Sequence, residues 1–413
     1  ENDSFQLVGA NISLGAGVAA WPKDDGLYIS GNIPVLSWEK IKSYTDSKEG
    51  GSAKLGDLTL REIDVQIGKL NLPSFPLTSV RLTIVPDDNT WDVGINSSEM
   101  SGHVQLPKKF SARETIKAQF DRISVGGKAS DNKSITSFDS ASLPSIIFSA
   151  EKVEYNNMSV GRVNFKTTSS RAGMTINSFS VNAPRMSLNA TGSWYGNTTK
   201  LSGTATSSNV SQFFESLGFD MHNFVSSEGR VEFQFTWSKP PYALSLASMS
   251  GQASINLGKG RIVELGQTSG AKMDIGRMLN IFSLQTIPRR LSLDFSDVFQ
   301  KGYSFDTFRG DFRFENGNAF TTNTAFNGPV AKVGIDGRIG LVARDYALTL
   351  SVTPYVTSSI PVAATLLTGQ PVIGIAAWAV DKVISSGVSK VTTYHYDVRG
   401  PWSNPSWGSA AAR

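Results

Sequence analysis

Residues 230–237 read Arg-Val-Glu-Phe-Gln-Phe-Thr-Trp, so polar and apolar side chains alternate at every position. Side chains of a β-strand point alternately to opposite faces, which places all four apolar residues on one face and the polar ones on the other. Strands with one apolar and one polar face are typical of an antiparallel sheet that is covered on one side. The same alternation recurs in residues 80–84, 291–296, 312–314 and 346–352.

Turn-forming residues separate these segments. Asp24-Asp25-Gly26, Gly258-Lys259-Gly260 and Glu315-Asn316-Gly317 are short runs of the residues that favour tight turns. The sequence therefore predicts a mostly β chain built on a long, twisted antiparallel sheet.

Helical patterns are few. Ser208 and Asn209 can cap a helix over residues 208–218, whose apolar residues recur at i, i+3, i+4 and i+7. Shorter helices are expected after Ser37 and over residues 271–282.

Two polar stretches, residues 43–56 and 125–144, read as long loops. Either can be a domain boundary or a surface connection. With a boundary at the second loop, we expect β segments at 1–125, 126–258 and 259–407. The end of the chain, 408–413, is expected to be a tail outside the fold, and residues 1–5 lack a signal-peptide pattern, which favours a mature form or a fragment.

No charged residue occurs between Tyr346 and Val380. Pro361, and Pro371 with its neighbouring glycines, favour two short helices in a hairpin over residues 360–386 rather than one continuous helix. Three alternatives stay open: the hairpin caps a β core, it meets a membrane or partner, or it spans a bilayer. If it meets a membrane or partner, the contact residues are Val362, Leu366, Leu367, Ile373, Ile375 and Trp378.

Composition argues against most catalytic classes. The 413 residues include no cysteine and only three isolated histidines, and the net charge is +4 without any block of like charge. Thiol chemistry is excluded, and we expect no enzyme, no metal, no cofactor and no nucleic-acid partner. His395 and Asp397 can share one strand face, but a surface strand is the favoured interpretation.

Arg289 and Arg290 precede the alternating segment 291–296. Ion pairs with nearby aspartates are the favoured interpretation, and contact with a lipid headgroup phosphate is the alternative.

From about residue 200 to 407, a series of motifs resembles the AsmA-like family of Gram-negative envelope proteins, which are bridge-like lipid transporters. The motifs keep their order and spacing and lie at residues 284–297, 301–306, 328–331, 337–341, 352–354, 366–369 and 396–402.

The resemblance implies a sheet rolled into an open apolar groove that carries phospholipid across the periplasm between the inner and outer membranes. It also implies that this chain is part of a longer protein with an inner-membrane anchor, whose outer-membrane partner is unknown. We expect acyl chains to lie against Val231, Phe233, Phe235, Leu291, Leu293, Phe295, Phe312, Phe314, Leu348 and Leu350. The competing hypothesis is a structural scaffold or adhesin, in which these residues fill a closed β core.

Overall fold

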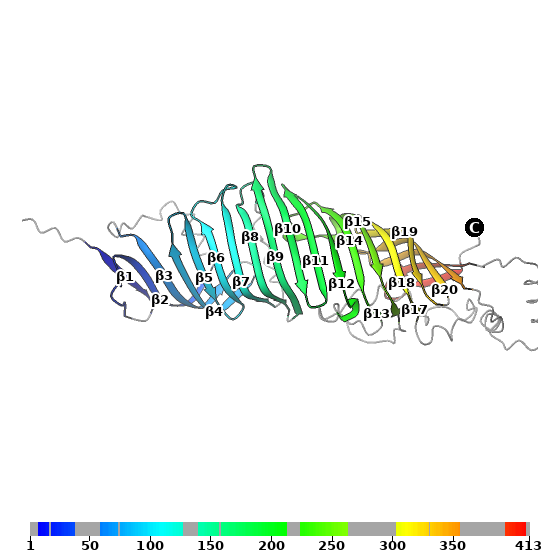
Figure 1. Cartoon of the computed structure of the whole chain (residues 1–413), viewed down its shortest axis with the longest axis horizontal. Coiled ribbons are helices and arrows are strands. Elements are labelled where there is room, and N and C mark those ends of the chain that lie inside the picture. The colour runs from blue at the N-terminus through cyan, green and yellow to red at the C-terminus, as the bar shows by residue number, and fades with distance from the viewer. Residues whose placement is uncertain are drawn as a thin grey trace, which may run out of the picture. The chain divides into compact units, whose positions relative to one another are not determined.

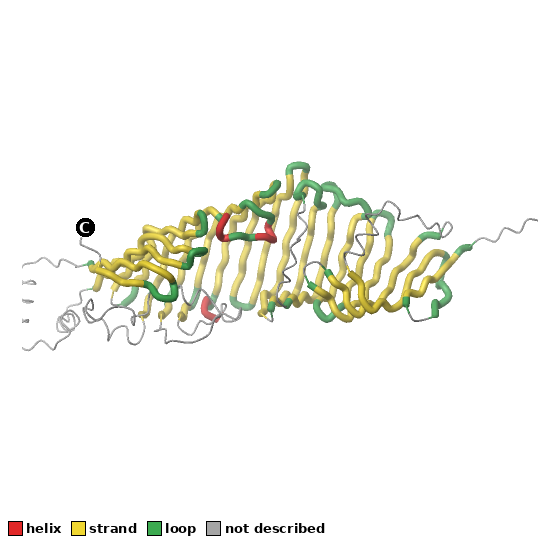
Figure 2. The backbone as a smooth tube through the Cα atoms, turned by 180° about the vertical axis from the view of Figure 1, so that it is seen from behind, coloured by secondary structure: helices red, strands yellow, loops and turns green. Residues whose placement is uncertain are grey.

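In a computed structural model of the chain, most of the described residues lie in strands, and helix is confined to short segments (Figure 2). The described residues are 7–15, 18–37, 58–72, 75–126, 139–156, 158–212, 224–262, 303–329, 331–355 and 393–409. The prediction of a mostly β chain is confirmed.

The chain divides into two compact units. The first comprises residues 1–184 and 191–196, and the second comprises residues 185–190 and 197–413. One strand, β11 (Met186–Tyr195), contributes residues to both units. The three segments expected from the sequence stay a prediction.

The strands of the first unit pair with their neighbours in chain order, from blue to green in Figure 1. They are β1 (Gly9–Leu14), β2 (Gly26–Ser37), β3 (Leu60–Asn71), β4 (Pro76–Pro86), β5 (Thr90–Asn96), β6 (Met100–Pro107), β7 (Thr115–Val125), β8 (Ser145–Tyr155), β9 (Met158–Ser170) and β10 (Gly173–Ala183).

The prediction of a purely antiparallel sheet is wrong, because the pairs β1–β2, β2–β3 and β7–β8 are parallel. A parallel neighbour requires the chain to return to the end where the previous strand began, which needs a long connection. Residues 38–59 and 126–144 provide this length for the second and third pairs. The two polar stretches recognised in the sequence lie between the strands of these two parallel pairs, and most of their residues lie outside the described residues.

The second unit has a larger sheet and a smaller one. The larger sheet is antiparallel over β12 (Thr198–Ser207), β14 (Gly229–Trp237), β15 (Ser250–Leu257), β18 (Thr307–Glu315), β19 (Asn318–Asn327), β20 (Ala331–Gly340), β21 (Asp345–Pro354), β22 (Tyr394–Pro401) and β23 (Ser406–Ser409). The smaller sheet contains β13 (Phe224–Ser226), β16 (Gly260–Ile262) and β17 (Tyr303–Phe305).

The helix expected over residues 208–218 begins as predicted. Residues 210–212 are helical, and the Asn209 side-chain oxygen accepts a hydrogen bond of 2.9 Å from the Gln212 backbone N–H, as an N-cap does. The rest of that helix lies outside the described residues. So do the helices expected after Ser37 and over 271–282, and the hairpin at 360–386.

Two features differ from the sequence analysis. The loop after β14 contains two 3-10 turns that no sequence pattern indicated, η1 (Pro241–Ala243) and η2 (Leu246–Ser248). Gly408 and Ser409, which the sequence assigned to a tail, lie in β23 and pair with Asp397 and Tyr396.

Candidate functional site

The strand register of the second unit brings the predicted apolar residues onto one face. Across β14, β15 and β18, Phe233 lies opposite Ala253, which lies opposite Phe312. One row along, Phe235, Gly251 and Phe314 are aligned in the same way. Directly opposed residues on neighbouring strands point to the same face. We call this surface the apolar face of the second unit; its predicted members among the described residues are Val231, Phe233, Phe235, Phe312, Phe314, Leu348 and Leu350.

Aromatic rings on this face contact one another across a glycine. The rings of Phe233 and Phe235 are stacked with centroids 5.4 Å apart, and Phe235 meets Phe314 edge-on at 5.1 Å. Gly251 lies between these two strands with a φ of +143°, and a Cβ there would be 2.0 Å from the Gln234 carbonyl oxygen. A side chain at this position would therefore collide with the backbone of β14, which together with the positive φ favours glycine.

Burial along the face is uneven. Val231, Phe233, Phe235, Phe312 and Phe314 are partly buried. Leu348 and Leu350, on β21, are 0% and 4% exposed. The aromatic part of the face keeps accessible apolar surface, whereas the two leucines are enclosed.

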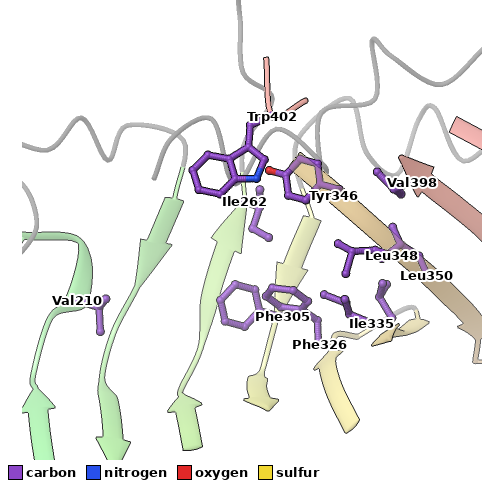
Figure 3. Close-up of a cluster of buried hydrophobic side chains, with 11 residues drawn as sticks. Val210, Ile262, Phe305, Phe326, Ile335, Tyr346, Leu348, Leu350, Val398 and Trp402 are labelled. Carbon is purple, nitrogen blue, oxygen red and sulfur yellow. The ribbon is translucent and has the colours of Figure 1, made fainter. Parts of the chain in front are cut away.

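The leucines belong to a packed cluster, drawn in Figure 3. Trp402 lies beside Tyr346, with ring centroids 6.0 Å apart, and its indole N–H donates to the Asp345 carbonyl oxygen. Burial raises the pKa of Tyr346. Phe305 meets Phe326 at 5.1 Å, so the small sheet packs against the larger one here. The buried members are Val210, Ile262, Phe305, Phe326, Val333, Ile335, Tyr346, Leu348, Leu350, Val398 and Trp402.

The first unit carries an apolar face of its own, which the sequence analysis did not propose as a site. Phe148 stacks on Phe165 at 4.9 Å and meets Phe120 at 5.9 Å. One row further along the same three strands, Ala150 on β8 lies between Phe120 on β7 and Val163 on β9. All three phenylalanines are partly buried. The period-two alternation in β7, β8 and β9 was the signal that could have identified this face.

A family model described as "YhdP protein" matches residues 1–407. The chain belongs to the YhdP family. The match includes the first half of the chain, where the motifs recognised in the sequence did not reach. The resemblance found in the sequence is therefore confirmed at the level of the YhdP family.

One relative is the intermembrane phospholipid transporter YhdP of Escherichia coli strain K12, which is 28% identical over 249 residues. The alignment covers 59% of this chain and 19% of the relative, so the matched region spans about a fifth of the relative's length. No solved structure matches the chain.

Several predicted site residues of this YhdP-family chain lie outside the described residues. They include three of the expected groove residues, both arginines proposed for headgroup contact and all six residues of the apolar C-terminal segment: Leu291, Leu293, Phe295, Arg289, Arg290, Val362, Leu366, Leu367, Ile373, Ile375 and Trp378. Within the described part of the chain, no helix is both long and apolar enough to cross a bilayer.

The polar face of the second unit holds an open trough of about 1040 Å³. Asp311 lines this trough and accepts hydrogen bonds from the Ser254 hydroxyl at 2.5 Å and the Asn323 side-chain amide at 2.7 Å. These bonds hold the pKa of the Asp311 carboxyl below its usual range. The polar lining includes Ser202, Thr204, Glu232, Gln234, Gln252 and Arg338.

Arg338 and Asp345 form a bidentate ion pair at 2.8 Å and 2.7 Å. The hydrogen bonds from Arg338 lower the pKa of the Asp345 carboxyl. A lowered pKa stabilises the fold above the unfolded-state value of about 3.9, and this contribution is lost as pH falls through the folded-state pKa. Both side chains are about one third exposed, so we expect less than about 1 kcal/mol.

In denaturant titrations, Asp345→Asn should therefore be less stable than the parent protein at pH about 6, and the difference should shrink below pH about 4. A difference that stays constant over this range would mean that the ion pair does not contribute through the charge of Asp345. Asp397→Asn is the control, because it removes a carboxylate from the same sheet whose ion pair with Arg399 is more exposed to solvent.

His395 and Asp397 lie on one face of β22, as predicted, but Asp397 accepts hydrogen bonds from Thr349 and Arg399. Among the described residues, no group of three or more acidic or histidine side chains converges in a way that could hold a metal ion.

Proposed function

We propose that this chain is a non-enzymatic segment of a transporter that moves phospholipid across the periplasm of a Gram-negative envelope, between the inner and outer membranes. Acyl chains lie against the apolar faces described above. Membership of the YhdP family supports this proposal, and so does the name of the E. coli relative. The observation that carries it is the register that aligns partly buried aromatic residues on one face across β14, β15 and β18.

The physics of such a face suits transport. Each methylene removed from water contributes about 0.8 kcal/mol, so two acyl chains can be held firmly. The hydrophobic effect is non-directional, and no hydrogen bond fixes a chain at one position along the face. A lipid can therefore slide along it while its polar headgroup stays in water.

Exposure divides the predicted contact residues. We assign acyl contact to Val231, Phe233, Phe235, Phe312 and Phe314, which keep accessible surface. Leu348 and Leu350 are enclosed by the cluster around Trp402 and support the face from within. Contact by Leu291, Leu293 and Phe295, headgroup binding by Arg289 or Arg290, and membrane or partner contact by the hairpin at 360–386 remain part of the proposal.

The alternative is a structural scaffold that binds no ligand. The enclosed cluster around Leu348 favours it, because that part of the larger sheet is already closed by protein. The two functions differ in whether the folded protein carries lipid.

The test is organic extraction of the folded, detergent-free protein followed by mass spectrometry, with a soluble β protein prepared in the same way as control. We expect phospholipid in near-stoichiometric amount in the YhdP-family chain and none in the control. An empty extract would favour the scaffold and place lipid binding elsewhere in the full-length protein.

A further inference from the structure

Four large apolar side chains are exposed at one end of the strands in the second unit. Three belong to the loop between β14 and β15: Tyr242 is 46% exposed, Leu244 59% and Leu246 46%. The fourth, Val342, follows β20 and is 56% exposed. We call these four residues the rim patch. Exposed apolar residues are ordinary when scattered, but a group of them marks an interaction surface.

The loops that carry the rim patch adjoin one another. Val342 donates its backbone N–H to the Gly317 carbonyl oxygen, which lies in the turn between β18 and β19. A Cβ placed on Gly317 would lie 2.7 Å from a Val342 methyl group and 3.8 Å from the Ala247 Cα atom. The loop after β14 and the loop after β20 therefore both lie beside Gly317. Leu246 precedes Ala247 in sequence, so it belongs to the part of its loop that lies near Val342.

The loop after β14 is held in place by hydrogen bonds. The Thr199 hydroxyl donates to the Lys239 carbonyl oxygen at 2.7 Å, and the Trp237 indole N–H donates to the Pro240 carbonyl oxygen at 3.1 Å. Asn197 donates to the Ser238 carbonyl oxygen at 3.0 Å. These bonds hold the backbone of the loop, while the side chains of Tyr242, Leu244 and Leu246 are each about half exposed.

The charged residues within the two loops of the rim patch are basic. Residues 238–249 and 341–344 contain Lys239 and Arg344, both exposed, and no acidic residue. Two acidic residues border these loops, and each pairs with an arginine: Glu315, beside the turn that contains Gly317, pairs with Arg313, and Asp345, which follows Arg344, pairs with Arg338.

We propose that the rim patch docks on the surface of a bilayer that contains anionic phospholipid. Leucine and valine side chains enter the interface, tyrosine lies at the headgroup level, and the Lys239 ammonium group faces the anionic headgroups. This docking is a separate property from the proposed acyl carriage, because it uses residues of the loops rather than of the apolar face.

The test is flotation of the whole chain with vesicles of phosphatidylglycerol and phosphatidylcholine, compared with vesicles of phosphatidylcholine alone. We expect stronger binding to the anionic vesicles. The double substitution Tyr242→Ser and Leu244→Ser should lower the partition coefficient at least about tenfold, since the burial of one leucine is of that order. Lys239→Glu should weaken binding to the anionic vesicles only.

Val225→Ser is the matched control, since Val225 is 52% exposed but lies on β13, outside the rim patch. It should float as the parent does. Unchanged flotation of the double variant would overturn the proposal. So would equal binding of the parent to both kinds of vesicle.

The two proposals can fail independently. Phe233→Asp should lose co-purified lipid but keep vesicle binding, whereas the double variant should lose vesicle binding but keep co-purified lipid. Loss of flotation in Phe233→Asp alone would mean that vesicles bind through the apolar face, and would overturn docking by the rim patch.

Discussion

Phe233→Asp should lower lipid cross-linking from a photoreactive residue at position 312 at least about tenfold. Phe233 and Phe312 flank Ala253 in one row of the apolar face, so a probe at 312 reports on the surface that Phe233 helps to form. A carboxylate in this row would have to lose water against an acyl chain, which costs several times the thermal energy. Transfer of phospholipid between donor and acceptor vesicles should fall with the cross-linking.

The matched control is Gln234→Asp. Gln234 is the next residue of β14, points to the opposite face and is exposed. It introduces the same charge in the same strand, so it separates an effect of the apolar face from an effect of net charge. Circular dichroism and thermal unfolding of both variants check that the sheet is intact. Equal cross-linking in parent and Phe233→Asp would mean that this face does not contact lipid.

The strands could be predicted because alternation is a local property. Residues 230–237 form β14 within one residue, and the predicted apolar residues lie on one face because the period of a strand is two. The direction of pairing could not be predicted in the same way. Whether two neighbouring strands are parallel depends on the end of the sheet to which the chain between them returns. A polar stretch such as 38–59 or 126–144 would have the same composition if it connected parallel strands or if it separated two domains.

The degree of burial of each apolar side chain was the other property that could not be predicted from the sequence. Leu348 and Phe233 occupy equivalent positions in their alternation patterns, yet only Leu348 is fully enclosed. The difference comes from residues far along the chain, since Phe305, Phe326 and Trp402 join the cluster of Leu348 through the tertiary fold. The sequence therefore placed the predicted residues on one face, as the strand register shows, but did not separate the enclosed part of that face from its accessible part. Lipid contact by this face stays a prediction.

Because Leu348 is enclosed and Phe233 is accessible, truncating these two side chains should lower the free energy of unfolding by different amounts. Leu348→Ala removes a fully buried side chain and should lower the free energy of unfolding by about 2–5 kcal/mol. Phe233→Ala should cost only about 1–2 kcal/mol in lipid-free protein, because Phe233 is only partly buried, although its ring stacks on that of Phe235. Denaturant unfolding of both variants measures the two costs.

The effect of these two truncations on stability also distinguishes the proposed lipid-carrying segment from the alternative, a structural scaffold that binds no lipid. In a closed scaffold, Phe233 is a core residue, and its truncation should cost about 3–5 kcal/mol, as for other buried phenylalanines. In a carrier, lipid covers Phe233, so added phospholipid should stabilise the parent more than Phe233→Ala. Leu348→Ala is the control for this second measurement, because its stabilisation by lipid should match that of the parent. A large cost for Phe233→Ala that lipid does not change would favour the scaffold.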